Sequence, residues 1–217
     1  MNPDCRNARE RQSNTNASYI RSLAEHGTVR SYAKNIILLQ EGDRTDQIYI
    51  VLSGRLKVFL SDSNGKEIIV DMLGENQFFG EMALEGDPRS ASVMTMEPSR
   101  VSIVERDRFQ HFLATNPDAA FDLILMLIRR ARNLTRLVGS LALLDVYGRV
   151  ARLLLDTTVD ESGQPIVSAR MTQKEIATRI GASRETVSRI LSDLREGGYI
   201  VYENDRIIVR QRLPKRW

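Results

Sequence analysis

Short runs of alternating hydrophobic and polar residues fill the chain between positions 30 and 105, and this alternation predicts β-strands. Glycines that lie 6 to 12 residues apart separate the runs, and turn signals such as Ser-Asn-Gly fall between them. The runs are IILLQ at 36–40, QIYIVLSG at 47–54, LKVFLSD at 56–62, EIIVDML at 67–73 and SRVSIVER at 99–106. Many short antiparallel strands with this spacing indicate a small jelly-roll β-barrel.

A helical period follows the last of these runs. A short helix is expected over 107–113 and a long one from Pro117 to about Leu144, because proline and an acidic residue favour the first turn. Apolar residues recur along the long helix at alternating spacings of 4 and 3, the seam of a two-stranded coiled coil. The seam residues are Leu127, Ala131, Leu134, Val138 and Leu141. They predict a homodimer interface, with a monomeric helix packed on its own barrel as the alternative.

The regions beside the seam and before the barrel carry simpler patterns. Ile124, Ile128 and Leu137 widen the apolar face of the long helix, and we expect them to cover the barrel. Residues 1–18 are polar and lack periodicity, so we expect a disordered arm. A short helix is expected over 19–25.

The C-terminal region predicts a winged helix-turn-helix. Asp145 can N-cap its first helix, and DESGQPIVS at 160–168 marks a turn between short strands. The TQKE sequence at 172–175 has the form of a capping box that starts a second helix. Glycines at 197 and 198 end a third helix, and YIVYENDRIIV at 199–209 predicts a hairpin wing.

The third helix exposes residues suited to reading DNA bases. Gly181 ends the helix before it and Ser183 caps it, which is the arrangement in which the second helix of the pair enters the major groove. Its exposed set is Arg184, Glu185, Ser188 and Arg189. Arginine suits guanine O6 and N7, and glutamate accepts from cytosine N4. The residues placed for phosphate contacts are Thr172, Ser183 and Thr186. A solvated helix face in a protein-interaction module is the alternative.

Charge and composition agree with this division. Residues 146–217 hold 13 Lys+Arg against 9 Asp+Glu, while the remaining residues hold 18 against 19, so the net charge of +3 is concentrated in the C-terminal region. A basic module beside a near-neutral remainder suits nucleic-acid binding. No apolar run is long enough to span a bilayer and the N-terminus lacks a signal peptide, so we expect a cytoplasmic protein without membrane contact.

The chain has few cysteine and histidine residues that could bind a metal ion. Cys5 is the only cysteine, and His26 and His111 are the only histidines and lie far apart. An iron–sulfur cluster or a structural zinc site would need more cysteines or a closer spacing. We therefore expect no metal cofactor, and a cupin-type enzyme would lack the strand histidines that its metal requires.

The stretch FFGEMALEGDPRSASV at 78–93 offers partners for a phosphorylated ribose. Gly80 allows close backbone approach, and a helical turn that begins at Glu81 would point amide N–H groups at an anion. Arg89 supplies a guanidinium for bidentate phosphate contact, Ser90 adds a hydroxyl donor, and Glu81 accepts from a sugar hydroxyl. We expect Arg89 to be solvated in the empty site. A tight turn with a solvated Glu81–Arg89 salt bridge is the alternative.

This stretch resembles the phosphate-binding cassette of cyclic-nucleotide-binding domains. The C-terminal third resembles the helix-turn-helix of the cyclic-AMP receptor and FNR (CRP/FNR) family of bacterial transcription regulators, and the likeness covers roughly residues 23–213. The residues implied to bind the nucleotide are Gly80, Glu81, Met82, Arg89 and Ser90. The match of GASRETVSRIL at 181–191 implies that Arg184, Glu185 and Arg189 read a TGTGA-like half-site.

The long helix departs from the family at the base-binding position. Cyclic-AMP-specific members carry Thr-Ser there, and both hydroxyls contact adenine, whereas this chain has Leu134-Thr135. Thr135 keeps one hydroxyl, and Val58 and Val70 are expected to form an apolar wall beside the base. The resemblance therefore implies cyclic AMP (cAMP) as effector, with weak preference over cyclic GMP (cGMP). Cyclic di-GMP, or no ligand at all, remains an alternative.

The predicted architecture is α+β. It comprises the arm at 1–18, a cyclic-nucleotide-binding barrel at 19–116, a dimerisation helix at 117–144 and the winged helix-turn-helix at 145–217. The resemblance implies a homodimeric regulator that binds double-stranded DNA at a TGTGA-like palindrome and contacts RNA polymerase. An enzyme, either a cupin or a phosphodiesterase, is the alternative from a different class.

Overall fold

The computed structural model describes residues 19–161, 164–167, 171–203 and 206–213. The expected disordered arm lies outside this range. The chain divides into two compact units, the first formed by Met1–Leu60 and Val70–Arg132 and the second by Ser61–Ile69 and Asn133–Trp217.

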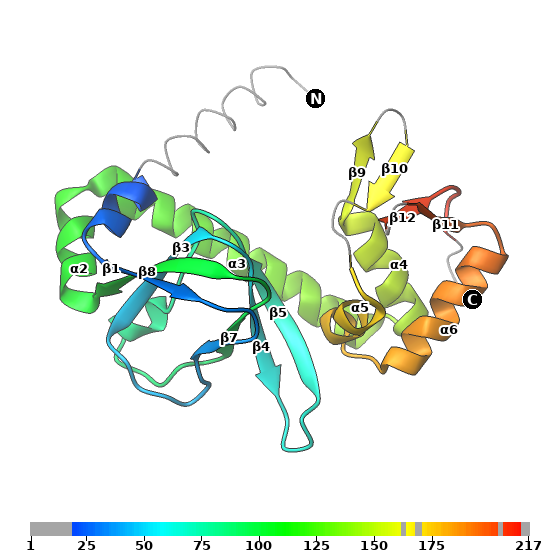
Figure 1. Ribbon diagram of the computed structural model, residues 1–217, viewed down its shortest axis with the longest axis horizontal. Coiled ribbons are helices and arrows are strands. Elements are labelled where there is room, and N and C mark those ends of the chain that lie inside the picture. The colour runs from blue at the N-terminus through cyan, green and yellow to red at the C-terminus, as the bar shows by residue number, and fades with distance from the viewer. Residues whose placement is uncertain (1–18, 162–163, 168–170, 204–205, 214–217) are drawn as a thin grey trace. The chain divides into compact units, whose positions relative to one another are not determined.

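Two four-stranded sheets with antiparallel pairing form the expected jelly roll (Figure 1). The first has the strand order β1 (Thr28–Tyr32), β8 (Ser99–Glu105), β3 (Gln47–Ser53) and β6 (Phe78–Phe79). The second has the order β2 (Ile37–Leu39), β7 (Ser92–Thr95), β4 (Leu56–Ser61) and β5 (Glu67–Leu73). All five expected runs are strands, whereas β1, β6 and β7 were not predicted.

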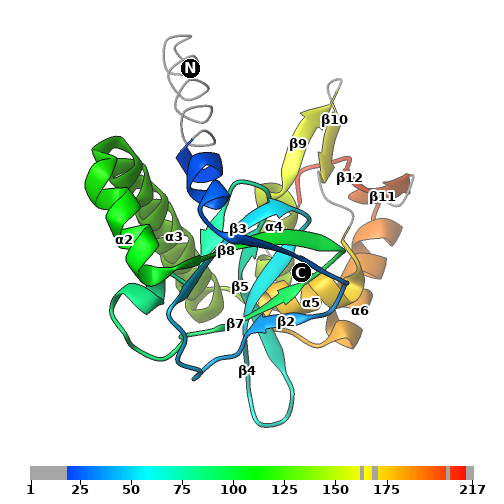
Figure 2. The same cartoon turned by 60° about the vertical axis from the view of Figure 1, so that its left-hand side comes forward.

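The apolar core of the barrel lies between the two sheets, because both sheets contribute to one buried cluster. Its members are Leu39, Tyr49, Val51, Leu56, Leu73, Phe79, Val93, Val101 and Ile103. Strand β3 is buried on both faces, since Ile48 and Ile50 belong to a second cluster that also contains Phe78 and Phe109. Residues of α2 (Arg106–Thr115), of the helical segment 19–25 and of α3 (Pro117–Leu143) pack into that second cluster (Figure 2).

Helix α3 covers this side of the barrel with a different stripe from the one predicted. Leu123 and Met126 pack against the cluster that contains Phe109. Ile124 and Ile128 are instead 51% and 43% exposed, so the expectation that they cover the barrel is wrong. Ile124 lies three residues before Leu127 and therefore extends the predicted coiled-coil seam towards the N-terminus.

The second unit contains the expected winged helix-turn-helix. Asp145 N-caps α4 (Val146–Asp156), accepting a hydrogen bond from the Gly148 amide at 2.7 Å. Helices α5 (Gln173–Ile180) and α6 (Arg184–Glu196) follow, and β11 (Ile200–Glu203) and β12 (Arg206–Val209) form the wing. A second hairpin, β9 (Thr158–Glu161) and β10 (Gln164–Val167), completes the sheet order β11-β12-β10-β9. Within the described residues, no helix is both long and apolar enough to cross a bilayer.

Candidate functional site

The backbone of the 78–93 stretch depends on Gly80. This residue has a φ of 86° and precedes the 3₁₀ helix η1 (Glu81–Leu84), so the expected helical turn at Glu81 is present. A Cβ atom at position 80 would come within 3.0 Å of the Gln47 carbonyl oxygen and 3.2 Å of Arg89 Nη1. Both the left-handed backbone and the close approach of Arg89 therefore require glycine here.

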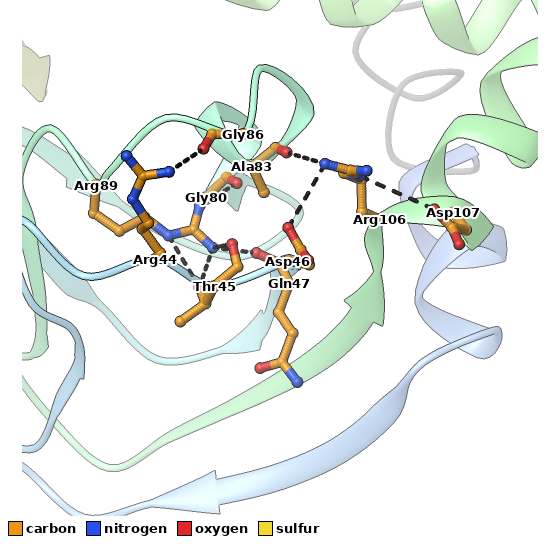
Figure 3. Close-up of polar contacts among 10 residues, drawn as sticks. All are labelled: Arg44, Thr45, Asp46, Gln47, Gly80, Ala83, Gly86, Arg89, Arg106 and Asp107. Carbon is orange, nitrogen blue, oxygen red and sulfur yellow. Dashed lines mark hydrogen bonds and ion pairs between the residues drawn. The ribbon is translucent and has the colours of Figure 1, made fainter.

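Arg89 is buried and bound to main-chain carbonyls (Figure 3). Its Nη1 donates to the Gly80 carbonyl at 2.5 Å, and its Nη2 donates to the carbonyls of Gln47 at 2.7 Å and Thr45 at 2.9 Å. The Thr45 hydroxyl accepts from Nη2 and from Nε, the latter at 3.1 Å. The Arg89 side chain is only 4% exposed, so the expectation of a solvated guanidinium is wrong.

These bonds limit what Arg89 can offer a phosphate. A guanidinium has five N–H donors, and four of them point at protein oxygens in this conformation. Burial lowers the pKa of Arg89, while the charge of Glu81 is among those that oppose this shift. Bidentate contact with a phosphate therefore requires Arg89 to exchange one or more of its present partners.

Glu81 pairs with an arginine from α3 rather than with Arg89. Arg130 Nη1 donates to Glu81 Oε1 at 2.8 Å, and Nη2 donates to the Phe78 carbonyl. The Nε atom of Arg130 lies 3.7 Å from Asp71 Oδ2 on β5. All three charged side chains are largely buried, with exposed fractions of 17% for Arg130, 18% for Glu81 and 29% for Asp71.

The sequence reasoning missed both Arg130 and Asp71. A signal for Arg130 was present, because it precedes Leu134 by one helical turn and so shares a face with the expected base-binding position. Asp71 is the polar residue of the run EIIVDML, but nothing in that run shows which face it occupies. Burial raises the pKa of the Asp71 carboxyl; the Met72 amide and Arg130 oppose this shift, and the charge of Glu81 adds to it.

The other predicted ligand residues lie at different depths. Ser90 and Met82 are exposed, and Val58 packs against the barrel core. Val70 is half-buried and adjoins Asp71 on β5. Successive residues of a strand point to opposite faces, so Asp71 and Val70 face opposite ways. Asp71 contacts Arg130, which also binds Glu81, so Asp71 and not Val70 is the β5 residue on the side of Glu81. Thr135 is exposed on the part of α3 that belongs to the second unit.

The predicted seam of α3 is exposed in the single chain. Val138 is 64% exposed, Leu134 is 45% exposed, and Leu127 and Leu141 are also exposed large apolar residues. Phe121 and Ile124 continue this apolar surface towards the start of the helix. A continuous row of exposed apolar side chains along a helix indicates an interaction surface.

The helix-turn-helix is built as the sequence predicts. The Thr172 hydroxyl accepts from the Glu175 amide at 3.1 Å, and the Ser183 hydroxyl accepts from the Thr186 amide at 3.1 Å, so both residues are N-caps. Gly181 ends α5 with a φ of 65°. Val187, Ile190, Leu191 and Leu194 of α6 are buried.

The opposite face of α6 presents the predicted base-reading set. Arg184, Glu185 and Arg189 are exposed as expected, whereas Ser188, which we expected to be exposed, is half-buried, as is Thr186. Hydrogen bonds from its own amide and from the Ser183 hydroxyl lower the pKa of Glu185, so this carboxylate stays ionised. The surface therefore carries two cations and one anion on one helix face.

Family comparisons identify a domain around each of these two regions. Residues 29–116 match the cyclic nucleotide-binding domain, and residues 148–213 match the Crp-like helix-turn-helix domain. The cAMP-activated global transcriptional regulator CRP of Pasteurella multocida is 33% identical over 192 residues, which cover 85% of this chain and 90% of that protein. The chain belongs to the CRP/FNR family of transcription regulators. The matched relatives are regulators and not enzymes, so the enzyme alternative is set aside.

A second relative in sequence and a solved structure are also similar to this chain. The CRP-like cAMP-activated global transcriptional regulator of Mycobacterium tuberculosis is 31% identical over 206 residues, 92% of each chain. Among solved structures, the c-di-GMP responsive global regulator CLP of Xanthomonas campestris matches with a TM-score of 0.77 and 24% identity, covering 90% of this chain and 100% of that one. This structural likeness shows the fold, a jelly-roll domain, a long helix and a helix-turn-helix.

Proposed function

We propose that this CRP/FNR regulator acts as a homodimer whose effector is a cyclic mononucleotide, with cAMP as the first candidate. The observation that carries the proposal is the arrangement around Gly80. Its carbonyl binds the buried Arg89, and the next residue, Glu81, is held by Arg130. One short segment thus supplies a cation and a carboxylate as partners for a cyclic phosphate and a ribose hydroxyl.

Each cassette residue has a role in this proposal. Glu81 accepts the ribose 2′-hydroxyl, and the Arg89 guanidinium and Ser90 hydroxyl bind the phosphate. Met82 and Val58 contact the nucleotide through apolar atoms, and Thr135 offers a hydroxyl to the base. Because Arg89 and Glu81 both have protein partners, the ligand must compete with existing hydrogen bonds, which lowers the net gain per contact.

The dimer follows from the exposed seam of α3. Leu127, Leu134, Val138 and Leu141 would be buried against the same residues of a second chain, with Ala131 between them. Full burial of an exposed side chain of this kind contributes roughly 1.5–3 kcal/mol, and these partly exposed residues would each gain a fraction of that. A two-fold dimer then presents two copies of α6 to DNA, and two-fold symmetric operators are palindromes.

The DNA site is proposed to be a TGTGA-like palindrome. Arg184 and Arg189 suit guanine, and Glu185 suits cytosine N4, so this helix face can read both strands of a TGTGA half-site. Hydroxyls of Thr172, Ser183, Thr186 and Ser188 contact phosphates or base edges at its margin. RNA polymerase is the further partner that we propose from family membership.

Cyclic di-GMP is the second candidate effector. Leu134 occupies the position where a hydroxyl would bind adenine, which weakens the case for a strictly adenine-specific site. The structural relative from Xanthomonas campestris is described as c-di-GMP responsive. That likeness is below 25% identity and is therefore only a reason to include this ligand in the test.

Calorimetric titration of the full chain with cAMP, cGMP and cyclic di-GMP tests the proposal. We expect cAMP to bind with weak preference over cGMP, and Glu81→Ala to lower affinity for both by at least about tenfold, since a bond to a charged acceptor is lost. Ser63→Ala, in an exposed turn, is the matched control. Equal binding by Glu81→Ala and the unmodified chain would refute the cassette. Binding of cyclic di-GMP alone would establish the second candidate.

A further inference from the structure

Asp71 is a largely buried carboxylate, and burial of a charge costs free energy. None of the nucleotide contacts proposed above involves it. It lies on β5, its side chain is 29% exposed, and it shares the Arg130 guanidinium with Glu81. Glu81 takes the short contact at 2.8 Å, whereas Asp71 Oδ2 lies 3.7 Å from Arg130 Nε, which is too long for a hydrogen bond. Asp71 Oδ1 accepts from the Met72 amide at 2.8 Å. Oδ2 therefore retains capacity to accept a hydrogen bond from a ligand.

The charged groups of the site are connected in a series by direct contacts. Arg89 Nη1 donates to the carbonyl of Gly80, the residue that directly precedes Glu81. Arg130 bridges Glu81 and Asp71 directly. The site therefore runs from Arg89 through Glu81 to Asp71, with Glu81 in the middle.

A nucleotide has the same order of parts. In a ribonucleoside cyclic phosphate, the phosphate and the base are attached on opposite sides of the ribose. With the phosphate at Arg89 and the ribose 2′-hydroxyl at Glu81, the base extends towards Asp71. A carboxylate at this end accepts N–H donors and repels the ring nitrogens and carbonyls that are acceptors only.

We infer that Asp71 reads the base of the effector and, by accepting hydrogen bonds from guanine N–H groups, keeps the preference for cAMP over cGMP weak. This inference rests on the proposed function of the same site. Guanine presents two adjacent donors, N1–H and the N2 amino group, which match Asp71 Oδ2 and the second lone pair of Oδ1, whose first lone pair accepts from the Met72 amide. Adenine presents a single donor group, the N6 amino group, beside the acceptor N1, which a carboxylate repels.

Substitution of Asp71 by asparagine inverts this chemistry. The Asn side chain keeps one acceptor oxygen and gains an NH2 donor group, so it can pair with the N6 amino group and the N1 acceptor of adenine but can no longer accept from both guanine N1–H and the guanine N2 amino group. We expect Asp71→Asn to raise the ratio of cAMP to cGMP affinity by roughly tenfold to a hundredfold, the worth of a hydrogen bond to a charged group. Asp71→Ala, whose side chain has no hydrogen-bonding group, removes the guanine contact without adding the adenine one.

The experiment is a calorimetric titration of the full chain with cAMP, cGMP and cyclic IMP, whose base has N1–H but no N2 amino group. In the unmodified protein cGMP should bind more tightly than cyclic IMP, and in Asp71→Ala the two should become equal. Glu75→Gln is the matched control: Glu75 is an exposed acid just after β5 that pairs with Arg21 at 3.2 Å, so it removes the same charge away from the site. Thermal melting checks that each variant is folded.

The outcomes separate this inference from the function on which it rests. If the unmodified protein binds cyclic mononucleotides but both Asp71 variants keep its cAMP to cGMP ratio within about twofold, the inference fails and the proposed function stands. If Glu75→Gln shifts the ratio as much as Asp71→Asn, the effect is one of general charge and the inference also fails. If no cyclic mononucleotide binds the unmodified protein, both are overturned.

Discussion

At the scale of single residues, the charged groups of the predicted cassette are held by partners from distant parts of the chain. Gly80, Glu81 and Arg89 fall within ten positions of one another, so a local motif reveals them. Thr45 and Gln47, which bind Arg89, come from 44 and 42 positions away. Such pairings are set by the fold of the barrel, and no local pattern encodes them.

Arg89 gives the first prediction. Arg89→Leu should lower the free energy of unfolding of the barrel by about 2–5 kcal/mol, because the carbonyls of Thr45, Gln47 and Gly80 lose their donor and an unsatisfied buried polar group costs about 1–3 kcal/mol. Urea denaturation of the unliganded chain measures this. Arg44→Leu is the control, since Arg44 is exposed and makes only a 3.4 Å contact with the Gly86 carbonyl. Equal stability of the two variants would contradict the buried role of Arg89.

Asp71 gives a prediction on pH. Burial raises its folded-state pKa above the ordinary 3.8, so the folded protein holds this proton more tightly than the unfolded chain does. Its contribution to stability is therefore lost as pH rises from about 3.8 through the folded-state pKa. Asp71→Asn should then stabilise the empty protein at pH 7 relative to the unmodified chain, and this advantage should shrink below pH 4. Melting temperatures at both pH values measure it; a loss of stability at pH 7 would show that the contact with Arg130 outweighs the cost of burial.

At the scale of elements, the helices and strands that carry local sequence signals were predicted, whereas those that form only by long-range pairing were not. The α5–α6 pair was predicted closely because its caps, Thr172 and Ser183, and its turn glycine, Gly181, are local. The two-residue strand β6 has no periodicity to detect, and it forms by pairing with β3. Helix α3 was predicted, yet Ile124 was assigned to the wrong face of it. Two apolar stripes run side by side along this helix with the same period, so the sequence does not show which of them covers the barrel.

The seam of α3 gives the next prediction. Val138→Glu should convert the dimer to a monomer in sedimentation, because a charge at a seam position would be buried without a partner. It should also abolish tight binding to a palindrome, since each chain carries one recognition helix. Asn133→Glu places the same charge on the outward side of the helix and should leave the dimer intact. A monomer from the unmodified chain, or a dimer from Val138→Glu, would refute the seam.

At the scale of the whole molecule, the proposed function is a coupling between two binding events. If a cyclic nucleotide raises the affinity for DNA by some factor, DNA must raise the affinity for the nucleotide by the same factor. Couplings of this kind are typically about 5- to 150-fold. The effector shifts the population of a DNA-binding state and need not create a new one.

The measurement that tests the account most directly is DNA binding by fluorescence anisotropy, with a labelled duplex that carries a TGTGA-type palindrome, with and without saturating cAMP. We predict that cAMP raises affinity by at least about fivefold. Arg189→Ala should weaken binding to this duplex by roughly 1–3 kcal/mol per half-site while leaving binding to a scrambled duplex nearly unchanged. The account would be contradicted if neither cAMP nor cGMP changed the affinity for the palindrome. It would also be contradicted if the palindrome and the scrambled duplex bound with equal affinity.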